Sequence, residues 1–161
     1  MGYWFCILVI VLLIPILMLV FGQHFYKNGA PKNINTLFGY RTQRSTKTWD
    51  SWTYAHKELG KLWRLIGLIL IPVSAGIFAL TIKMDVDGIS IYAILIQALQ
   101  IVAIVVSIIL IEKKLKKNFD ERGERTEESL AAEAAALNAK EQKNAAKAEK
   151  SEKKAKKSEK S

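Results

Sequence analysis

The stretch YWFCILVIVLLIPILMLVFG (Tyr3–Gly22) contains no charged residue among its 20 positions. At about 1.5 Å rise per residue, a helix of this length spans roughly 30 Å, the thickness of the hydrocarbon core of a bilayer. Lipid cannot hydrogen-bond a bare backbone, so a membrane-spanning helix is expected. No basic residue precedes the apolar run and no small-residue cleavage site follows Phe21, which favours a retained helix over a cleaved signal peptide.

Two further apolar blocks follow, at about residues 65–82 and 89–111. Apolar residues crowd into these blocks, whereas a soluble domain interleaves apolar and polar residues at helix or strand period. The sequence therefore predicts an all-α membrane protein with three transmembrane helices. Cys6 is the single cysteine, so no intrachain disulfide can form.

Charge predicts the orientation of these helices. Residues 23–64 carry eight basic and two acidic residues, whereas the turn at 83–88 carries one basic and two acidic residues. The segment after Ile111 opens with four lysines (Lys113, Lys114, Lys116 and Lys117). By the positive-inside rule, residues 23–64 and the C-terminal tail are expected in the cytoplasm, with the short turn and the N-terminus outside.

The spans contain few polar or helix-breaking residues. Pro15 and Pro72 should each kink a helix unless a neighbour satisfies the freed carbonyl. Gln97 and Gln100 share a face of the third span and should meet another helix there. No charged residue or histidine lies within a span, which argues against an ion or proton pathway.

An amphipathic helix is predicted before the second span. Its aromatic face recurs at three- and four-residue steps, through Trp49, Trp52, His56, Leu59 and Trp63. Thr48 suits the N-cap, and the carboxylate of Asp50 suits the first turn. We expect this helix to lie at the cytoplasmic interface, with tryptophans at headgroup level and basic residues on anionic lipid, and to continue into the second span.

The preceding stretch, NTLFGYRTQR (residues 35–44), reads as a turn. Gly39 can adopt a positive φ, and the guanidinium of Arg41 could then fork onto a phosphate or a carboxylate. Composition alone therefore suggests a positioned contact for an anion or a lipid headgroup.

Three pieces of this region resemble the signature of the SdpI/YfhL family of bacterial membrane proteins. They are INTLFGYRT, a tryptophan seven residues past Thr42, and AHKELGKLW, and the resemblance extends over residues 1–122. The motif falls on Asn35, Gly39, Tyr40, Arg41, Thr42, Trp49, Ala55, His56, Lys57, Gly60 and Lys61. All of these except Ala55 and Lys57 are our candidate binding residues.

The resemblance implies a function. Founding members of the family protect a toxin-producing bacterium from its own secreted, membrane-active peptide. The best-known member, which has additional spans, also holds a transcriptional repressor at the membrane. The resulting hypothesis is an immunity protein of the bacterial plasma membrane. The alternative is a module that holds a cytoplasmic regulator through residues 23–64 or the tail. The toxin and the oligomeric state are left open.

Catalysis is not expected. His56 is the one plausible acid–base group in residues 23–64, and the sequence offers no carboxylate cluster, nucleophile pair or metal-ligand spacing beside it. We therefore predict a protein that is not an enzyme and that uses neither a metal nor a cofactor.

Residues 123–161 form an Ala/Lys/Glu-rich tail after the membrane domain of residues 1–122. Helix propensity is high, but no apolar stripe is available for burial, so a marginal helix with a disordered end from Lys147 is predicted. A solvated cytoplasmic extension is the favoured interpretation, and electrostatic attachment to the inner leaflet is the alternative. Nucleic acid is disfavoured because no aromatic residue follows Phe119 to stack on a base.

Overall fold

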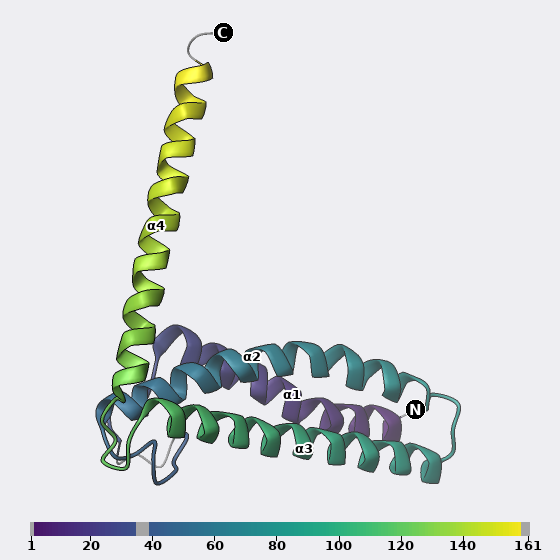
Figure 1. Cartoon of the computed structure of the whole chain (residues 1–161). Helices are drawn as coiled ribbons and strands as arrows, with labels where there is room; N and C mark the ends of the chain where they lie inside the picture. Colours follow the sequence, from purple (N-terminus) through teal and green to yellow (C-terminus); the bar gives the residue numbers. More distant parts are fainter. Residues whose placement is uncertain (1, 35–38, 159–161) are drawn as a thin grey trace.

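The computed structural model describes residues 2–34 and 39–158, and these residues fold into four helices (Figure 1). They are α1 (Gly2–Asn28), α2 (Trp49–Ala79), α3 (Val86–Asn118) and α4 (Glu127–Ser158). The first three are long and apolar enough to cross a membrane. The predicted all-α membrane fold with three spanning helices is confirmed.

Each spanning helix is longer than a bilayer requires. At 31 and 33 residues, α2 and α3 are about 46 and 50 Å long, against roughly 30 Å of hydrocarbon. The extra turns gather at the end of the bundle where residues 29–48 join α1 to α2 and residues 119–126 join α3 to α4. We name this the loop end. A short turn joins α2 to α3 at the opposite end (Figure 1).

The predicted amphipathic helix is the first half of α2, but the middle of its aromatic face is covered by protein rather than by lipid headgroups. Trp52, His56 and Leu59 are buried within the protein. The expected contact of these side chains with the membrane surface is therefore wrong. The cause is α1, which continues past its apolar stretch to Asn28 and packs against this part of α2.

Small residues let α1 and α2 approach closely. A Cβ added at Gly60 would lie 2.7 Å from the backbone nitrogen of Tyr26, and one at Gly67 would lie 2.8 Å from that of Leu19. Such backbone contact is how small residues bring helices together in membranes.

A side chain of α3 replaces the hydrogen bond that Pro15 removes from α1. Proline has no N–H, so the carbonyl of Val11, four residues earlier, has no donor within α1. The side-chain amide of Gln100 on α3 donates to that carbonyl at 3.0 Å and to the hydroxyl of Ser74 on α2 at 2.9 Å. Gln97 likewise donates to the carbonyl of Ile10 at 3.3 Å. The predicted glutamine face does meet another helix.

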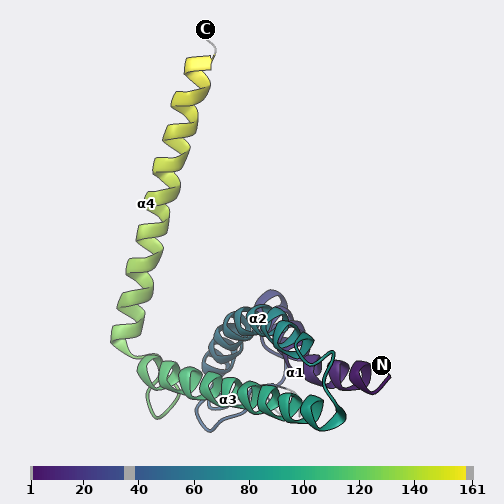
Figure 2. The same cartoon turned by 90° about the vertical axis from the view of Figure 1, so that its right-hand side faces the viewer.

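The hairpin at residues 119–126 packs on the start of α2. Thr48 is the N-cap of α2 as predicted, and its hydroxyl donates to the carbonyl of Gly123 at 2.7 Å. The Arg125 guanidinium forms ion pairs with Asp50 of α2 and Glu133 of α4. These contacts fix the origin of α4, which then projects away from the bundle (Figures 1 and 2).

The tail is more helical than the sequence predicted. Disorder was expected from Lys147, whereas α4 continues as a helix to Ser158. The high helix propensity of alanine, glutamate and lysine accounts for this continuation, because the described side chains of α4, at 127–145, are almost all exposed and offer little packing.

Candidate binding site at the loop end of the bundle

The motif residues that follow Gly39 form a closed turn. The Thr42 N–H donates to the Ser45 hydroxyl at 2.8 Å, and the Ser45 N–H donates to the Thr42 hydroxyl at 3.2 Å. Ser45 is fully buried, and its own hydroxyl donates to the carbonyl of Tyr40 at 2.9 Å. Arg41 lies between these bonded residues, so its backbone is held from both sides.

His56 braces this turn from beneath. The Tyr40 backbone N–H donates to His56 Nε2 at 2.9 Å, so that ring nitrogen is the acceptor. The other nitrogen, Nδ1, then carries the proton and donates to the carbonyl of Trp52 at 2.8 Å. Burial lowers the pKa of His56 below its usual value, which agrees with a neutral ring. The histidine is a fixed structural acceptor.

Gly39 makes this brace possible. Its φ of +129° lies in a region that L side chains rarely adopt. A Cβ at this position would lie 2.5 Å from His56 Nε2 and 2.8 Å from the indole ring of Trp52. The glycine is therefore required both by backbone conformation and by the close approach of two buried rings.

The side chain of Tyr40 ties the turn to α3. Its hydroxyl donates to the carbonyl of Ile108 at 3.3 Å and lies 3.4 Å from the carboxylate of Glu112. Burial and the nearby Glu112 charge raise the pKa of Tyr40 to about 12, so the phenol stays protonated and able to donate. Glu112 also pairs with Arg44 at 3.6 Å. The turn thus connects α2 with α3.

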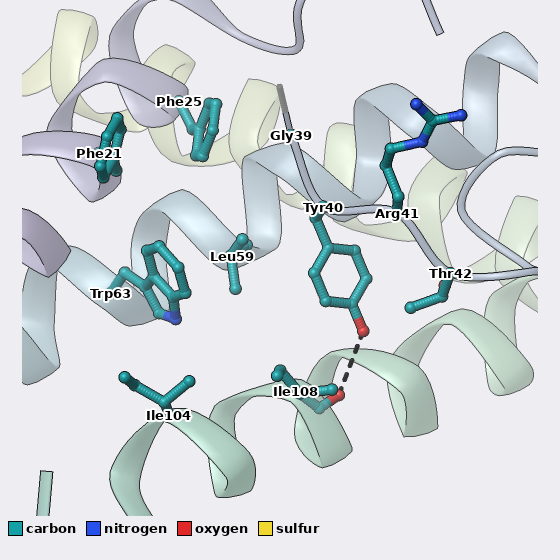
Figure 3. Close-up of a pocket in the computed structure, with 10 residues that line it drawn as sticks. All are labelled: Phe21, Phe25, Gly39, Tyr40, Arg41, Thr42, Leu59, Trp63, Ile104 and Ile108. Atoms are coloured by element: carbon teal, nitrogen blue, oxygen red, sulfur yellow. Dashed lines mark hydrogen bonds between the residues drawn. The ribbon is translucent and has the colours of Figure 1, made fainter. Parts of the chain in front are cut away.

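A pocket of about 480 Å³ opens beside the turn, and its size lies in the range of small-molecule sites. Figure 3 shows its apolar walls, and its roof is formed by residues 39–42. The wall residues are Phe21 and Phe25 of α1, Leu59 and Trp63 of α2, and Ile104 and Ile108 of α3. The guanidinium of Arg41 points away from these apolar side chains, at the rim of the pocket (Figure 3).

The motif that builds this turn identifies the family. Residues 32–111 match the model of the SdpI/YfhL protein family. The chain belongs to this family. Comparison with curated proteins and with solved structures gave no match. The SdpI/YfhL match contains the turn, all of α2 and most of α3, and therefore every part of the pocket except its α1 wall.

Five of the nine candidate residues come together here: Gly39, Tyr40, Arg41, Thr42 and His56. Trp49, at the start of α2, is 51% exposed and does not line the pocket. Gly60 lies at the α1–α2 contact, where no ligand could reach it. Asn35 lies outside the described residues.

Lys61 belongs to a separate polar face. It pairs with Glu58 at 2.5 Å, and Glu58 also pairs with Lys114 of α3 at 2.5 Å. Burial opposes ionisation of Glu58, but the hydrogen bonds from Lys114 and Lys61 outweigh it and lower its pKa. The Glu58–Lys114 pair therefore links α2 to α3, and Lys61 of the SdpI/YfhL motif supports it from within α2.

Sequence reasoning missed the walls of the pocket and the role of Ser45. Leu59 and Trp63 were expected on the aromatic face of the amphipathic helix, but not in a pocket. Phe21, Ile104 and Ile108 are apolar residues of the predicted first and third spans, which carry no mark that distinguishes them from lipid-facing neighbours. Ser45 had a usable signal, because a serine three residues after a threonine can form reciprocal side-chain to backbone bonds.

Nothing in the described part of the chain resembles a catalytic centre. No group of three histidine, cysteine, aspartate or glutamate side chains is placed to hold a metal there. Both ring nitrogens of His56 are occupied by structural hydrogen bonds. That the SdpI/YfhL chain is not an enzyme stays a prediction.

Proposed function

We propose that this SdpI/YfhL family member is an integral membrane immunity protein, which protects a bacterium from a secreted, membrane-active peptide toxin. The observation that carries the proposal is the motif turn itself. Its signature residues build one braced structure that presents Arg41 at the rim of an apolar pocket. The three spanning helices would hold this structure at the membrane, where such a toxin acts.

The proposed orientation places the loop end in the cytoplasm. The support is the charge asymmetry, with eight basic and two acidic residues in 23–64 against one basic and two acidic residues in 83–88. In this orientation the pocket meets the inner leaflet. Protection would then act on toxin that has entered the bilayer, or on the damage it causes.

A survival assay tests the immunity function. The intact chain is expressed in a sensitive bacterium, which is challenged with the peptide toxin of the family's producers and with a panel of unrelated membrane-active peptides. We expect the expressing cells to survive the family's toxin better than empty-vector cells do. Against the unrelated peptides, the two strains should survive equally. Equal killing of both strains by every peptide, with the protein confirmed in the membrane, would contradict the proposal.

A second function, holding a cytoplasmic partner, is favoured by one observation. Leu130 and Leu137 of α4 are 52% and 55% exposed, lie seven residues apart and so share a face of the projecting helix. A pull-down with the intact chain should then recover a defined soluble protein. The double variant Leu130→Glu, Leu137→Glu should lose that protein, whereas exchange of the exposed Lys140 for alanine should not.

A further inference from the structure

The pocket lies at the boundary of the hydrocarbon layer. Phe21 and Ile108 are in the last turns of the first and third apolar stretches, and Trp63 lies two residues before the second. Tyr40 and Arg41 belong to the segment beyond that boundary. The walls are therefore at the depth of acyl chains, while the rim is at the depth of headgroups.

Three polar side chains of the walls and roof, those of Trp63, Tyr40 and Thr42, are hydrogen-bonded within the protein. The indole N–H of Trp63 donates to the hydroxyl of Ser107 at 2.9 Å. The phenol of Tyr40 donates to the carbonyl of Ile108, and the hydroxyl of Thr42 accepts from the backbone of Ser45. An occupant with its own amides would leave them unsatisfied in this space, at a cost of several kcal/mol each in a dry environment. A hydrocarbon chain has no such groups.

The rim carries a cation. The guanidinium of Arg41 lies at the mouth, directed away from the apolar side chains (Figure 3). A guanidinium suits a phosphate because its planar fork matches two oxygens. The same position would repel a second cation.

From these observations we propose that the pocket holds one acyl chain of an anionic phospholipid, whose phosphate contacts Arg41. The lipid belongs to the leaflet that meets the loop end. The inference concerns a ligand of the resting protein and holds whether or not the chain confers immunity.

Native mass spectrometry of the full-length protein in detergent tests this site. The delipidated protein is titrated with dioleoyl phosphatidylglycerol, with dioleoyl phosphatidylcholine, and with glycerol phosphate, which has the anionic group and no chains. We expect one tightly bound phosphatidylglycerol per chain and no competition by glycerol phosphate. Phosphatidylcholine keeps the phosphate but adds a choline cation near Arg41, so it should bind about fivefold more weakly, as an unfavourable charge contact of about 1 kcal/mol predicts.

Two substitutions separate the chain contact from the headgroup contact. Ile104→Trp fills the pocket and should abolish tight binding of phosphatidylglycerol, whereas Ile101→Trp, at a position 55% exposed on the outer face of α3, should not. Arg41→Ala should weaken phosphatidylglycerol to the level of phosphatidylcholine, and exchange of the exposed Lys32 for alanine should have no such effect. Ile108→Phe is a second filling variant, and circular dichroism verifies that each variant is folded.

Three results would overturn the proposal. Phosphatidylglycerol binding that survives both filling variants would place the lipid elsewhere. Equal competition by glycerol phosphate would reduce the site to a headgroup contact. The third result has two parts: an equimolar membrane-active peptide displaces the bound lipid, and phosphatidylglycerol and phosphatidylcholine bind equally. That result would make the peptide the natural occupant of the pocket.

Discussion

The backbone N–H of Tyr40 donates to Nε2 of His56 at 2.9 Å, across 16 residues of sequence. This bond fixes the tautomer of a fully buried histidine and holds the motif turn on α2. It explains why the motif combines the glycine and tyrosine of the turn with a histidine far along the chain, because the histidine accepts the bond that holds the turn in place.

Replacement of His56 by phenylalanine tests this brace. The ring is kept, but the buried Tyr40 N–H loses its acceptor, which should cost about 1–3 kcal/mol of unfolding free energy. Thermal unfolding in detergent measures the loss. Lys57→Ala, on the exposed side of the same turn of α2, is the matched control and should change little. A His56→Phe protein as stable as the parent would mean that the hydrogen bond contributes nothing.

The same histidine predicts a pH dependence. Burial lowers its pKa in the folded protein below the ordinary 6.5. In the unfolded chain it takes up a proton near pH 6.5, and in the folded protein only at lower pH. Its contribution to stability is therefore complete above pH 6.5 and declines as the pH falls from 6.5 toward the folded pKa. The midpoint of thermal unfolding between pH 5 and 8 should show this decline in the parent and a smaller one in His56→Phe.

The close contact of α1 and α2 predicts opposite outcomes for two glycines. Gly60→Ala places a Cβ 2.7 Å from the backbone of Tyr26 and should cost about 1–3 kcal/mol by forcing the helices apart. Gly76→Ala on the same helix meets nothing within 4 Å and should be neutral or up to about 1 kcal/mol stabilising, because alanine favours helix. Unfolding midpoints of the two proteins provide the comparison. Equal effects at both positions would contradict the packing described.

The bond between Gln100 and Val11 predicts energetic coupling to Pro15. In the parent protein, Gln100→Leu should be destabilising, because Pro15 has no N–H and Gln100 is the donor to the Val11 carbonyl. In a Pro15→Ala background the alanine N–H satisfies that carbonyl, so Gln100→Leu should cost less. A double-mutant cycle should give a coupling energy of about 1 kcal/mol, within the range of hydrogen bonds in membranes. An additive cycle would show that the glutamine does not compensate for the proline.

The spanning helices and part of the candidate site could be predicted from the sequence, because both depend on residues that are close together along the chain. The spanning helices follow from the apolar composition of each block. Thr48 as the N-cap, and Gln100 on a face that meets another helix, follow from the positions of these residues along a single helix. The burial of His56 did not follow, because it depends on α1 extending past its apolar stretch to cover α2. Likewise, nothing local distinguishes Ile104 in the pocket from Ile101 outside it, since that difference arises only from how three helices pack.

A survival measurement tests whether Arg41, at the pocket rim, takes part in protection. Cells that express the intact chain, Arg41→Ala or Lys32→Ala at equal membrane levels are challenged with the secreted peptide toxin of the family's producers. Trp49→Ala, at an exposed motif position outside the pocket, is tested in parallel and is also predicted to lose protection. We expect the intact chain and Lys32→Ala to protect, and Arg41→Ala not to protect. Full protection by Arg41→Ala would contradict this expectation, since the turn would then be a scaffold whose arginine takes no part in immunity.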